Sequence, residues 1–403
     1  MRYLLLRLKR FCGFIAGFVF FIAGIFKLLD PVGAGLVMKE YMDFLHLGFL
    51  SAVAKPSAVA LAFLETVIGT ALITGIWRRA TAVAAIAFQV FFTLLTLMLV
   101  IKNPDMDCGC FGEAIHLTHM QTFIKNIILL CLLLLFAIPF KHLGGPKKQK
   151  YVSFGLVAVS VVAFAVYSWF SIPLVDYTEF KPAMALQAGS AFGIDEEDMY
   201  EALFVYEKDG SQQEFTLDML PDSTWNFIET RTVLKEDMTN SAVNLSFYDA
   251  EGEYKDILAT HGKVLVISVY NPSARQGLWR KIADLIQVAE VAGLKPLVLV
   301  AAHPEQMQDI YSRIPELASG LKPYQYFSDY KTLITLNRSN AGVTFFSDGY
   351  LVRKWAVRSY PDAAEAKEIF EGDDTETIIG SSTTGSLAFQ GFLLYVFAVM
   401  LLL

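Results

Sequence analysis

The stretch FCGFIAGFVFFIAGIFKLL, residues 11–29, carries a single charge, Lys27, and is followed by Asp30-Pro31. At about 1.5 Å per residue, a helix of this length crosses the roughly 30 Å hydrocarbon core of a bilayer. It has no small-residue cleavage site, so we expect a retained membrane span and not a removed signal peptide. Five further apolar runs, and thus five further expected spans, lie at 57–76, 80–101, 122–140, 152–171 and 386–403.

The composition divides the chain in the same way. The protein is 54% hydrophobic with a mean hydropathy of +0.44, and the apolar excess lies in the six runs. Residues 172–384 instead hold 33 acidic and 18 basic residues, a balance that argues against nucleic acid or anionic lipid as the partner of this soluble region. We expect a four-span membrane domain at 1–145, a fifth span at 146–173, a linker and β-hairpin region at 174–240, a soluble domain at 241–380, and a sixth span at 385–403.

Lysine and arginine gather at three places that fall on one side of the membrane if every run crosses it. The clusters are Arg2, Arg7, Lys9 and Arg10; Arg78 and Arg79; and Lys141, Lys147, Lys148 and Lys150. Basic residues flanking spans favour the cytoplasmic side. The pattern predicts a bacterial inner-membrane protein with a cytoplasmic N-terminus. Residues 174–384 and the loop between the third and fourth spans would then lie in the periplasm.

That loop contains the sequence Asp107-Cys108-Gly109-Cys110-Phe111-Gly112, with two of the four cysteines of the chain. A disulfide across one intervening residue is strained and therefore easily reduced, and Gly109 supplies the backbone freedom that it needs. Cys108 and Cys110 are the candidate catalytic thiols for an activity like that of a thiol–disulfide oxidoreductase. The sequence does not identify a cofactor, and a quinone is the candidate electron acceptor. Cys12 and Cys131 do not look placed to act as a second pair, so a partner would have to supply one.

Two other interpretations of the pair remain. With His116 and His119 the loop has the pattern C-x-C-x5-H-x2-H, whose ligand types suit zinc or copper although the spacing is no recognised zinc pattern. Alternatively, the pair is a structural disulfide that holds the loop.

Four polar residues of the expected spans lie toward the same side as this loop. They are Lys27, Glu65, Lys125 and Asn126. An ionisable group inside a membrane costs a few kcal/mol unless it is paired or near water. We expect either a polar pocket under the loop, with Glu65 pairing Lys27 or Lys125, or an ion pair that only holds the helices together.

These motifs together resemble a known family. The stretch Ala23 to Pro31, followed by Glu65 with Gly69 and Gly75, resembles the DoxX superfamily of four-helix membrane proteins. The loop with Cys108 and Cys110, followed by Lys125-Asn126, is similar to the MauE branch, named for methylamine utilisation. The resemblance covers about residues 10–140 and implies a membrane helper in the maturation of periplasmic thiol or electron-transfer proteins.

The soluble region has the pattern of an α/β domain. Apolar runs at 264–270 and 296–302 flank a stretch with helical spacing, which predicts a strand–helix–strand unit. Residues 202–217 and 342–355 predict β-hairpins, the second turning on Asp348-Gly349. This element order resembles a thioredoxin-like domain over about residues 240–372.

This soluble region lacks the redox motif of active thioredoxins. Its Cys-x-x-Cys position holds Asn271-Pro272-Ser273-Ala274-Arg275-Gln276, and the soluble region has no cysteine. The former active-site face then becomes a candidate partner-binding surface, and the alternative is an inert structural domain. The candidate residues are Asn271, Pro272, Ser273, Asn340 and Gly342.

We therefore expect a membrane protein that assists thiol–disulfide or electron-transfer maturation of envelope proteins. Its partners would be an envelope protein client or partner subunit and the membrane lipid, with no nucleic acid. One alternative is a non-catalytic scaffold or assembly factor for an envelope complex. The other is metal or small-molecule handling through the bundle.

Overall fold

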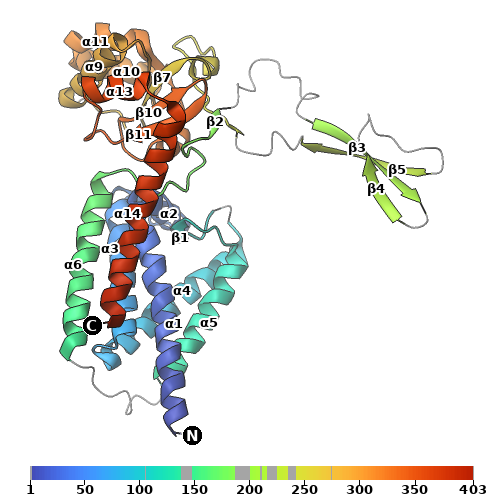
Figure 1. The fold of residues 1–403 in the computed structure, drawn as a ribbon, viewed down its shortest axis with the longest axis vertical. Coiled ribbons are helices and arrows are strands. Elements are labelled where there is room, and N and C mark those ends of the chain that lie inside the picture. The colour runs from blue at the N-terminus through green and yellow to red at the C-terminus, as the bar shows by residue number, and fades with distance from the viewer. Residues whose placement is uncertain are drawn as a thin grey trace. The chain divides into compact units, whose positions relative to one another are not determined.

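The structure, a computed structural model, describes residues 2–104, 106–137, 148–186, 200–208, 211–215, 225–234, 242–273 and 275–402. The chain divides into two compact units. The first unit comprises residues 1–178 and 380–403, and the second comprises residues 179–379. Figure 1 shows a bundle of long helices in the first unit and a sheet with helices around it in the second.

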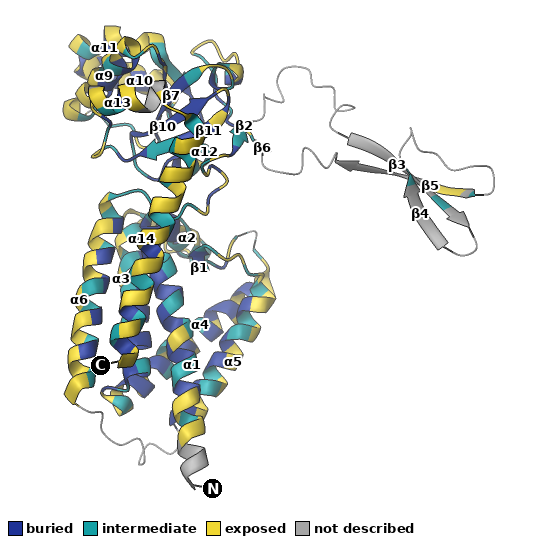
Figure 2. Ribbon diagram, in the orientation of Figure 1, coloured by how far each residue is buried: buried dark blue, intermediate teal, exposed yellow. Residues whose placement is uncertain are grey.

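The first unit is a helical membrane region. Its elements are α1 (Arg2–Leu29), α2 (Pro31–Phe44), the 3₁₀-helix η1 (Gly48–Val53), α3 (Ala54–Thr74), α4 (Arg78–Lys102), the short strand β1 (Cys110–Glu113), α5 (His119–Ala137), α6 (Lys148–Phe170) and α14 (Asp374–Leu402). Among the described residues six helical segments are long and apolar enough to span a membrane, and each predicted run falls on one of them. Many residues of α5, α6 and α14 are exposed (Figure 2), and they include apolar ones such as Ile128, Val159 and Leu394, as expected where lipid covers a helix.

Helices α1 and α3 pack closely because glycines leave room between them. A Cβ added at Gly24 would lie 2.2 Å from Oγ1 of Thr66, and one at Gly69 would lie 2.5 Å from the backbone nitrogen of Phe21. Small residues at such positions let membrane helices approach each other backbone to backbone. This contact fixes the relative height of the two helices, and therefore of the polar groups that they carry.

Helix α2 was not predicted from the sequence. It begins directly after α1, where the Asp30 side chain accepts hydrogen bonds from the backbone nitrogens of Val32 and Gly33 at 3.2 and 2.9 Å. Pro31 occupies the first helical position, where its missing N–H costs nothing. Aspartate followed by proline is a helix-start signal, so the sequence did contain the evidence for this helix.

Helix α14 is bound to α6 along its length. The rings of Phe164 and Phe392 stack with centroids 4.6 Å apart. Further along, Nζ of Lys150 donates to the carbonyl of Met400 at 2.9 Å, and Oγ of Ser153 donates to that of Val399 at 2.7 Å. The start of α6 therefore satisfies backbone carbonyls in the last turn of α14, which have no partner within their own helix.

The second unit contains a seven-stranded mixed sheet in the order β6-β2-β11-β10-β7-β8-β9. Its strands are β2 (Ala185–Leu186), β6 (Ala242–Val243), β7 (Lys263–Val269), β8 (Lys295–Val300), β9 (Gln325–Phe327), β10 (Gly342–Ser347) and β11 (Tyr350–Trp355). Its helices are η4 (Asp256–Ala259), α9 (Gln276–Val291), α10 (Pro304–Arg313), α11 (Pro315–Leu321), η5 (Lys322–Tyr324), α12 (Tyr330–Leu336) and α13 (Ala363–Glu371).

Strand β7 is the centre of this unit, and both of its faces are buried. Leu265, Ile267 and Val269 pack into a core with α9, while Val264 and Val266 pack into a second core with α12. A strand that reads as a continuous apolar run is typical of a sheet covered on both faces. The parallel pairing of β7 with β8 through α9 confirms the predicted strand–helix–strand unit.

The hairpins predicted at 202–217 and 342–355 are also present. Strands β10 and β11 pair antiparallel, and their turn holds Asp348 and Gly349 at positive φ, 45° and 80°. Strands β3 (Tyr200–Lys208) and β4 (Ser211–Phe215) pair antiparallel in a separate three-stranded sheet, completed by β5 (Asn226–Leu234). The turn between β3 and β4, residues 209–210, lies outside the described residues.

Candidate functional site

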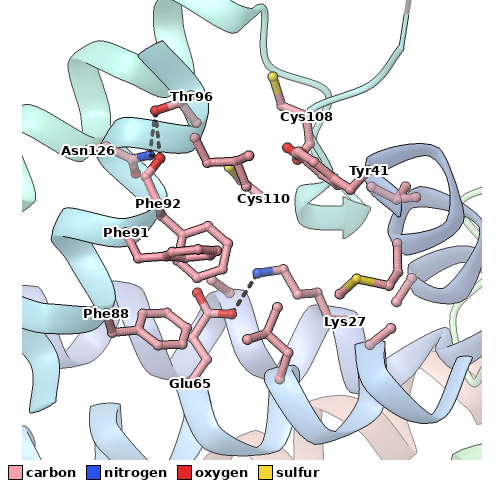
Figure 3. A pocket seen from close by; sticks show the side chains of 18 of the residues that line it. Lys27, Tyr41, Glu65, Phe88, Phe91, Phe92, Thr96, Cys108, Cys110 and Asn126 are labelled. Carbon is pink, nitrogen blue, oxygen red and sulfur yellow. Dashed lines mark hydrogen bonds and ion pairs between the residues drawn. The ribbon is translucent and has the colours of Figure 1, made fainter. Parts of the chain in front are cut away.

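A cavity of about 340 Å³ lies in the first unit between α1, α2, α3, α4, α5 and the loop that follows α4. All six membrane-side residues singled out from the sequence are in its lining. They are Lys27, Glu65, Cys108, Cys110, Lys125 and Asn126. The remaining wall is largely apolar, and Figure 3 shows Phe88, Phe91 and Phe92 along one side of it.

A buried ion pair lies in this cavity. Nζ of Lys27 on α1 is 2.6 Å from Oε2 of Glu65 on α3, and the two side chains are only 14% and 11% exposed. The pair lies next to the close contact of Gly24 with Thr66, which brings the two helices to the same height. Of the two lysines considered from the sequence, Lys27 is thus the partner of Glu65. Lys125 instead lies with Nζ 5.0 Å from the ring centroid of Phe111, a cation–π contact.

The loop with the two cysteines is held against α1 and α2. The hydroxyl of Tyr41 on α2 donates to the backbone carbonyl of Cys108 at 2.9 Å. Gly109 has a φ of +55°, and a Cβ at this position would lie 2.4 Å from Cγ1 of Val37. Gly112 has a φ of +59° and packs near the carbonyl of Phe26. Glycine is required between the cysteines both for this left-handed backbone and for the close approach to α2.

The two cysteines have different surroundings. Both are free thiols, Cys108 buried and Cys110 partly exposed. Burial raises the pKa of the Cys108 thiol, while the hydroxyl of Thr122 and the charge of Lys125 act in the opposite direction. Thr122 is fully buried on α5, and its hydroxyl has no nitrogen or oxygen partner in the described part of the chain. Cys108 thus sits deeper in the wall than Cys110.

Asn126 ties two helices together. Its side-chain Nδ2 donates to Oγ1 of Thr96 at 3.2 Å, and its backbone carbonyl accepts from Nε2 of Gln89 at 3.1 Å. These bonds join α5 to α4 where both helices line the cavity. The side-chain amide of Asn126 thus helps to hold α5 against α4. The sequence alone did not indicate its hydrogen-bond partners.

The two histidines of the loop do not converge on the cysteines. Nδ1 of His116 lies 3.5 Å from Oδ2 of Asp107, and both side chains are well exposed. His119 contacts Oδ1 of Asn103 and the carbonyl of Met106, at 3.3 and 3.0 Å. Among the described residues, no group of three or more His, Cys, Asp or Glu side chains is arranged to hold a metal ion.

The candidate partner-binding residues of the second unit lie around the end of β7. The backbone nitrogen of Asn271 donates to Oδ1 of Asn340 at 2.8 Å, and Nδ2 of Asn340 donates to the carbonyl of Asn271 at 3.0 Å. The carbonyl of Ser273 accepts from Nε1 of Trp279 at 2.7 Å. The two bonds between Asn271 and Asn340 join the segment 271–273, which includes Pro272, to the segment before β10. Ala274 lies outside the described residues.

The segment before β10 has a strained backbone. Ala341 is fully buried and has a φ of +58°, a conformation that non-glycine residues rarely adopt. The next residue, Gly342, leaves no room for a side chain, because a Cβ there would lie 2.2 Å from Oδ1 of Asn337. Backbone strain of this kind persists only where the surrounding contacts enforce it, and it gathers at functional sites.

Sequence reasoning missed the contribution of α2. Tyr41, Val37 and Met38 line the cavity, and Tyr41 holds the loop, yet the sequence analysis assigned no element to this segment. The aromatic wall formed by Phe88, Phe91 and Phe92 was also missed. These rings lie within an apolar run, where composition does not distinguish a side chain that lines a cavity from one that faces lipid.

Two parts of the chain match known protein families. Residues 3–139 match the family described as methylamine utilisation protein MauE, and residues 200–237 match a domain of unknown function, DUF8463. The chain is also similar to Protein TlpB of Flavobacterium psychrophilum, with 26% identity over 153 residues, which is 37% of this chain and 41% of that protein. The chain thus covers less than half of that relative. No solved structure matches.

Proposed function

We propose that the chain is a bacterial inner-membrane protein that exchanges thiols and disulfides with envelope proteins through Cys108 and Cys110. The observation that carries this proposal is the position of two free thiols in the wall of one membrane-embedded cavity, on a loop fastened to two helices. A loop held in this way keeps the pair in one place for reaction with a partner. The match of residues 3–139 to MauE agrees with the proposal.

The chemistry needs only the pair and a partner dithiol. In the oxidising direction, a partner thiolate attacks the Cys108–Cys110 disulfide, forms a mixed disulfide and releases one cysteine of the pair as a thiolate. The second partner thiolate then attacks the mixed disulfide, which leaves the partner oxidised and both cysteines reduced. Cys110 is the better candidate for the mixed disulfide, because it is more exposed than Cys108.

Contacts within the first unit support the proposed orientation. The ring of Trp77, at the turn between α3 and α4, lies 5.8 Å from that of Tyr151 near the start of α6. Two of the basic clusters, at 78–79 and 148–150, therefore share one end of the unit. At the opposite end Lys55 lies over the ring of Trp169 at 4.5 Å. Aromatic residues at both ends are typical of the two membrane interfaces, and the basic end is then cytoplasmic.

The second unit is proposed to bind the client. Its order β11-β10-β7-β8, with α9 after β7, is the arrangement expected of a thioredoxin-like domain. Asn271, Pro272 and Ser273 then stand where such a domain has its cysteines, beside Asn340 and Gly342. A surface without thiols holds an extended peptide by backbone hydrogen bonds without reacting with it.

The first experiment measures the redox state of the pair. Membranes containing the full chain are equilibrated in glutathione buffers of defined potential, and free thiols are then trapped with a maleimide of added mass. We expect Cys108 and Cys110 to be oxidised and reduced together as a two-electron couple. A pair that stays reduced or stays oxidised across the whole range contradicts exchange.

The second experiment tests the client-binding surface. Ser273→Cys places a thiol on the proposed surface, and Val291→Cys places one at a position that is 91% exposed on α9. Both are made in the full chain with Cys108 and Cys110 replaced by serine. We expect mixed disulfides with envelope proteins at Ser273→Cys well above those at Val291→Cys. Equal capture at both positions refutes a binding surface at 271–273.

A scaffold is the second candidate, and the burial of Cys108 favours it. A buried thiol with a raised pKa is a poor nucleophile and suits a structural cysteine. In that case Cys108→Ser and Cys110→Ser would each lower the thermal stability of the purified protein, and the envelope proteins would keep their normal disulfides in cells that carry either variant.

A further inference from the structure

The cavity beneath the cysteines reaches the lipid-facing side of the bundle. Its lining includes three exposed apolar side chains, Leu47, Leu50 and Phe91. Phe91 is 57% exposed on α4, and Leu50 lies near the first residue of the second candidate span, Gly48–Thr74. In a membrane region, exposed apolar side chains contact hydrocarbon and not water. A ligand of this cavity therefore enters from the bilayer and carries an apolar part.

The inner part of the cavity is polar on one side and aromatic on the other. The Lys27 ammonium has three donors, and the carboxylate of Glu65 accepts one of them at 2.6 Å. Phe20, Phe88 and Phe92 supply flat apolar surface in the same lining. The head of the ligand is then a flat ring with an oxygen that accepts a hydrogen bond. An ion pair at this depth is costly to maintain and marks a functional site by default.

The size of the cavity limits which lipid-soluble molecules can bind in it. Sites for small molecules have volumes of roughly 300–1,000 Å³, so about 340 Å³ suits one ring system and the start of a tail. A phospholipid with two acyl chains and a charged headgroup is too large for this volume. A neutral ring with one isoprenoid tail fits both the volume and the charges.

We infer that the cavity binds a lipid-soluble quinone, which is the electron acceptor for Cys108 and Cys110; this inference rests on the proposed function. The ring lies against the phenylalanine wall, one carbonyl oxygen accepts a hydrogen bond from Lys27, and the tail leaves past Phe91. In the reaction the two S–H bonds break and one S–S bond forms. The electron pair reduces the quinone, and the two protons end on its oxygens as hydroquinone.

The test uses the purified full chain in lipid nanodiscs, reduced, desalted and kept anaerobic. A ubiquinone with a single isoprene unit is added, and hydroquinone formation and thiol loss are followed together by absorbance and maleimide trapping. We expect one hydroquinone for each pair of thiols lost. Oxidised glutathione is added to a parallel sample as a water-soluble oxidant.

Three outcomes separate the two claims. Oxidation by both reagents supports both. Oxidation by glutathione disulfide but not by the quinone overturns the quinone site and leaves the proposed function standing. Oxidation by neither reagent overturns the proposed function as well, and with it the inference.

Variants then place the reaction in the cavity. Phe91→Ala removes the ring at the opening, and Leu94→Ala is its matched control, because Leu94 is 58% exposed on the same helix and does not line the cavity. We expect the half-saturating quinone concentration to rise at least fivefold in Phe91→Ala and to stay within twofold in Leu94→Ala. The double variant Lys27→Gln with Glu65→Gln leaves no unpaired charge and should slow quinone reduction at least tenfold. If all three variants react like the unaltered protein, the quinone meets the thiols elsewhere and the site is refuted.

Discussion

Replacement of Gly109 by alanine should release the loop that carries the two cysteines. The new Cβ would lie 2.4 Å from Cγ1 of Val37, and the backbone would have to keep a φ of +55°. A left-handed conformation costs a non-glycine residue about 1–2 kcal/mol. Overpacking of this kind costs about 1–3 kcal/mol more. Val37 has little freedom to turn aside, because a β-branched side chain in a helix has one strongly preferred rotamer.

The backbone strain and the overpacking together destabilise the closed conformation of the loop by about 2–5 kcal/mol. Since about 1.4 kcal/mol corresponds to a factor of ten in an equilibrium constant, local opening should become at least tenfold more frequent. Cys108 is buried in the closed loop, so its alkylation by a small reagent should accelerate by at least tenfold. The rate is measured by quenched labelling and mass spectrometry on the protein in nanodiscs, with the unaltered protein labelled in parallel as the reference.

A second substitution separates the two sources of strain. Val37→Ala removes the methyl groups that the new Cβ would meet, so the double variant should keep only the backbone cost of about 1–2 kcal/mol. Its Cys108 should then react at a rate between those of Gly109→Ala and the unaltered protein. If Gly109→Ala alkylates within threefold of the unaltered protein, the loop is not held against α2 as described. If the double variant is no slower than Gly109→Ala, the contact with Val37 is not the cause.

The remaining predictions concern the same unit. Tyr41→Phe removes the hydrogen bond to the Cys108 carbonyl, worth about 1 kcal/mol net, so quenched labelling should show Cys108 reacting about fivefold faster; an unchanged rate would mean that this bond does not hold the loop. Because burial raises the pKa of the Cys108 thiol and the thiolate is the reactive form, its alkylation should keep rising at pH values where an exposed cysteine has levelled off. Thr122→Val removes a hydroxyl that lowers this pKa and should move the profile to still higher pH; a shift to lower pH would reverse the assigned role. Gly24→Val should lower the thermal aggregation temperature in detergent through overpacking of about 1–3 kcal/mol or more, whereas Gly155→Val, with nothing within 4 Å, should not; similar losses in both would refute the close packing of α1 on α3.

The elements that follow from local patterns were predictable from the sequence. The six apolar runs each correspond to a long helix, and the turn at Asp348-Gly349 joins the two strands expected on either side. Apolar length and turn chemistry are properties of short segments, and they survive in any tertiary arrangement. Helix α2 was missed because its uncharged run, residues 31–38, is too short to suggest a membrane span, although Asp30-Pro31 marked its start.

The site was predictable as a set of residues but not as an arrangement. Polar groups inside apolar spans are costly, so Lys27, Glu65 and Asn126 could be singled out from the sequence. Which lysine pairs with Glu65 depends on the relative height of two helices, and the contact of Gly24 with Thr66 decides it. Such contacts between distant segments have no signature in a single sequence.

The bonds between α6 and α14 have a consequence for biosynthesis. The carbonyls of Val399 and Met400 accept from Ser153 and Lys150, groups about 250 positions earlier in the chain. During synthesis Lys150 and Ser153 therefore lack these two acceptors until residues 179–379 and then α14 have been made. A ribosome that stalls in that interval leaves a bundle that lacks one helix. In such an unfinished chain Lys150 and Ser153 lack the carbonyl partners that α14 supplies, so the last helix completes the polar contacts of the fifth span as well as the bundle itself.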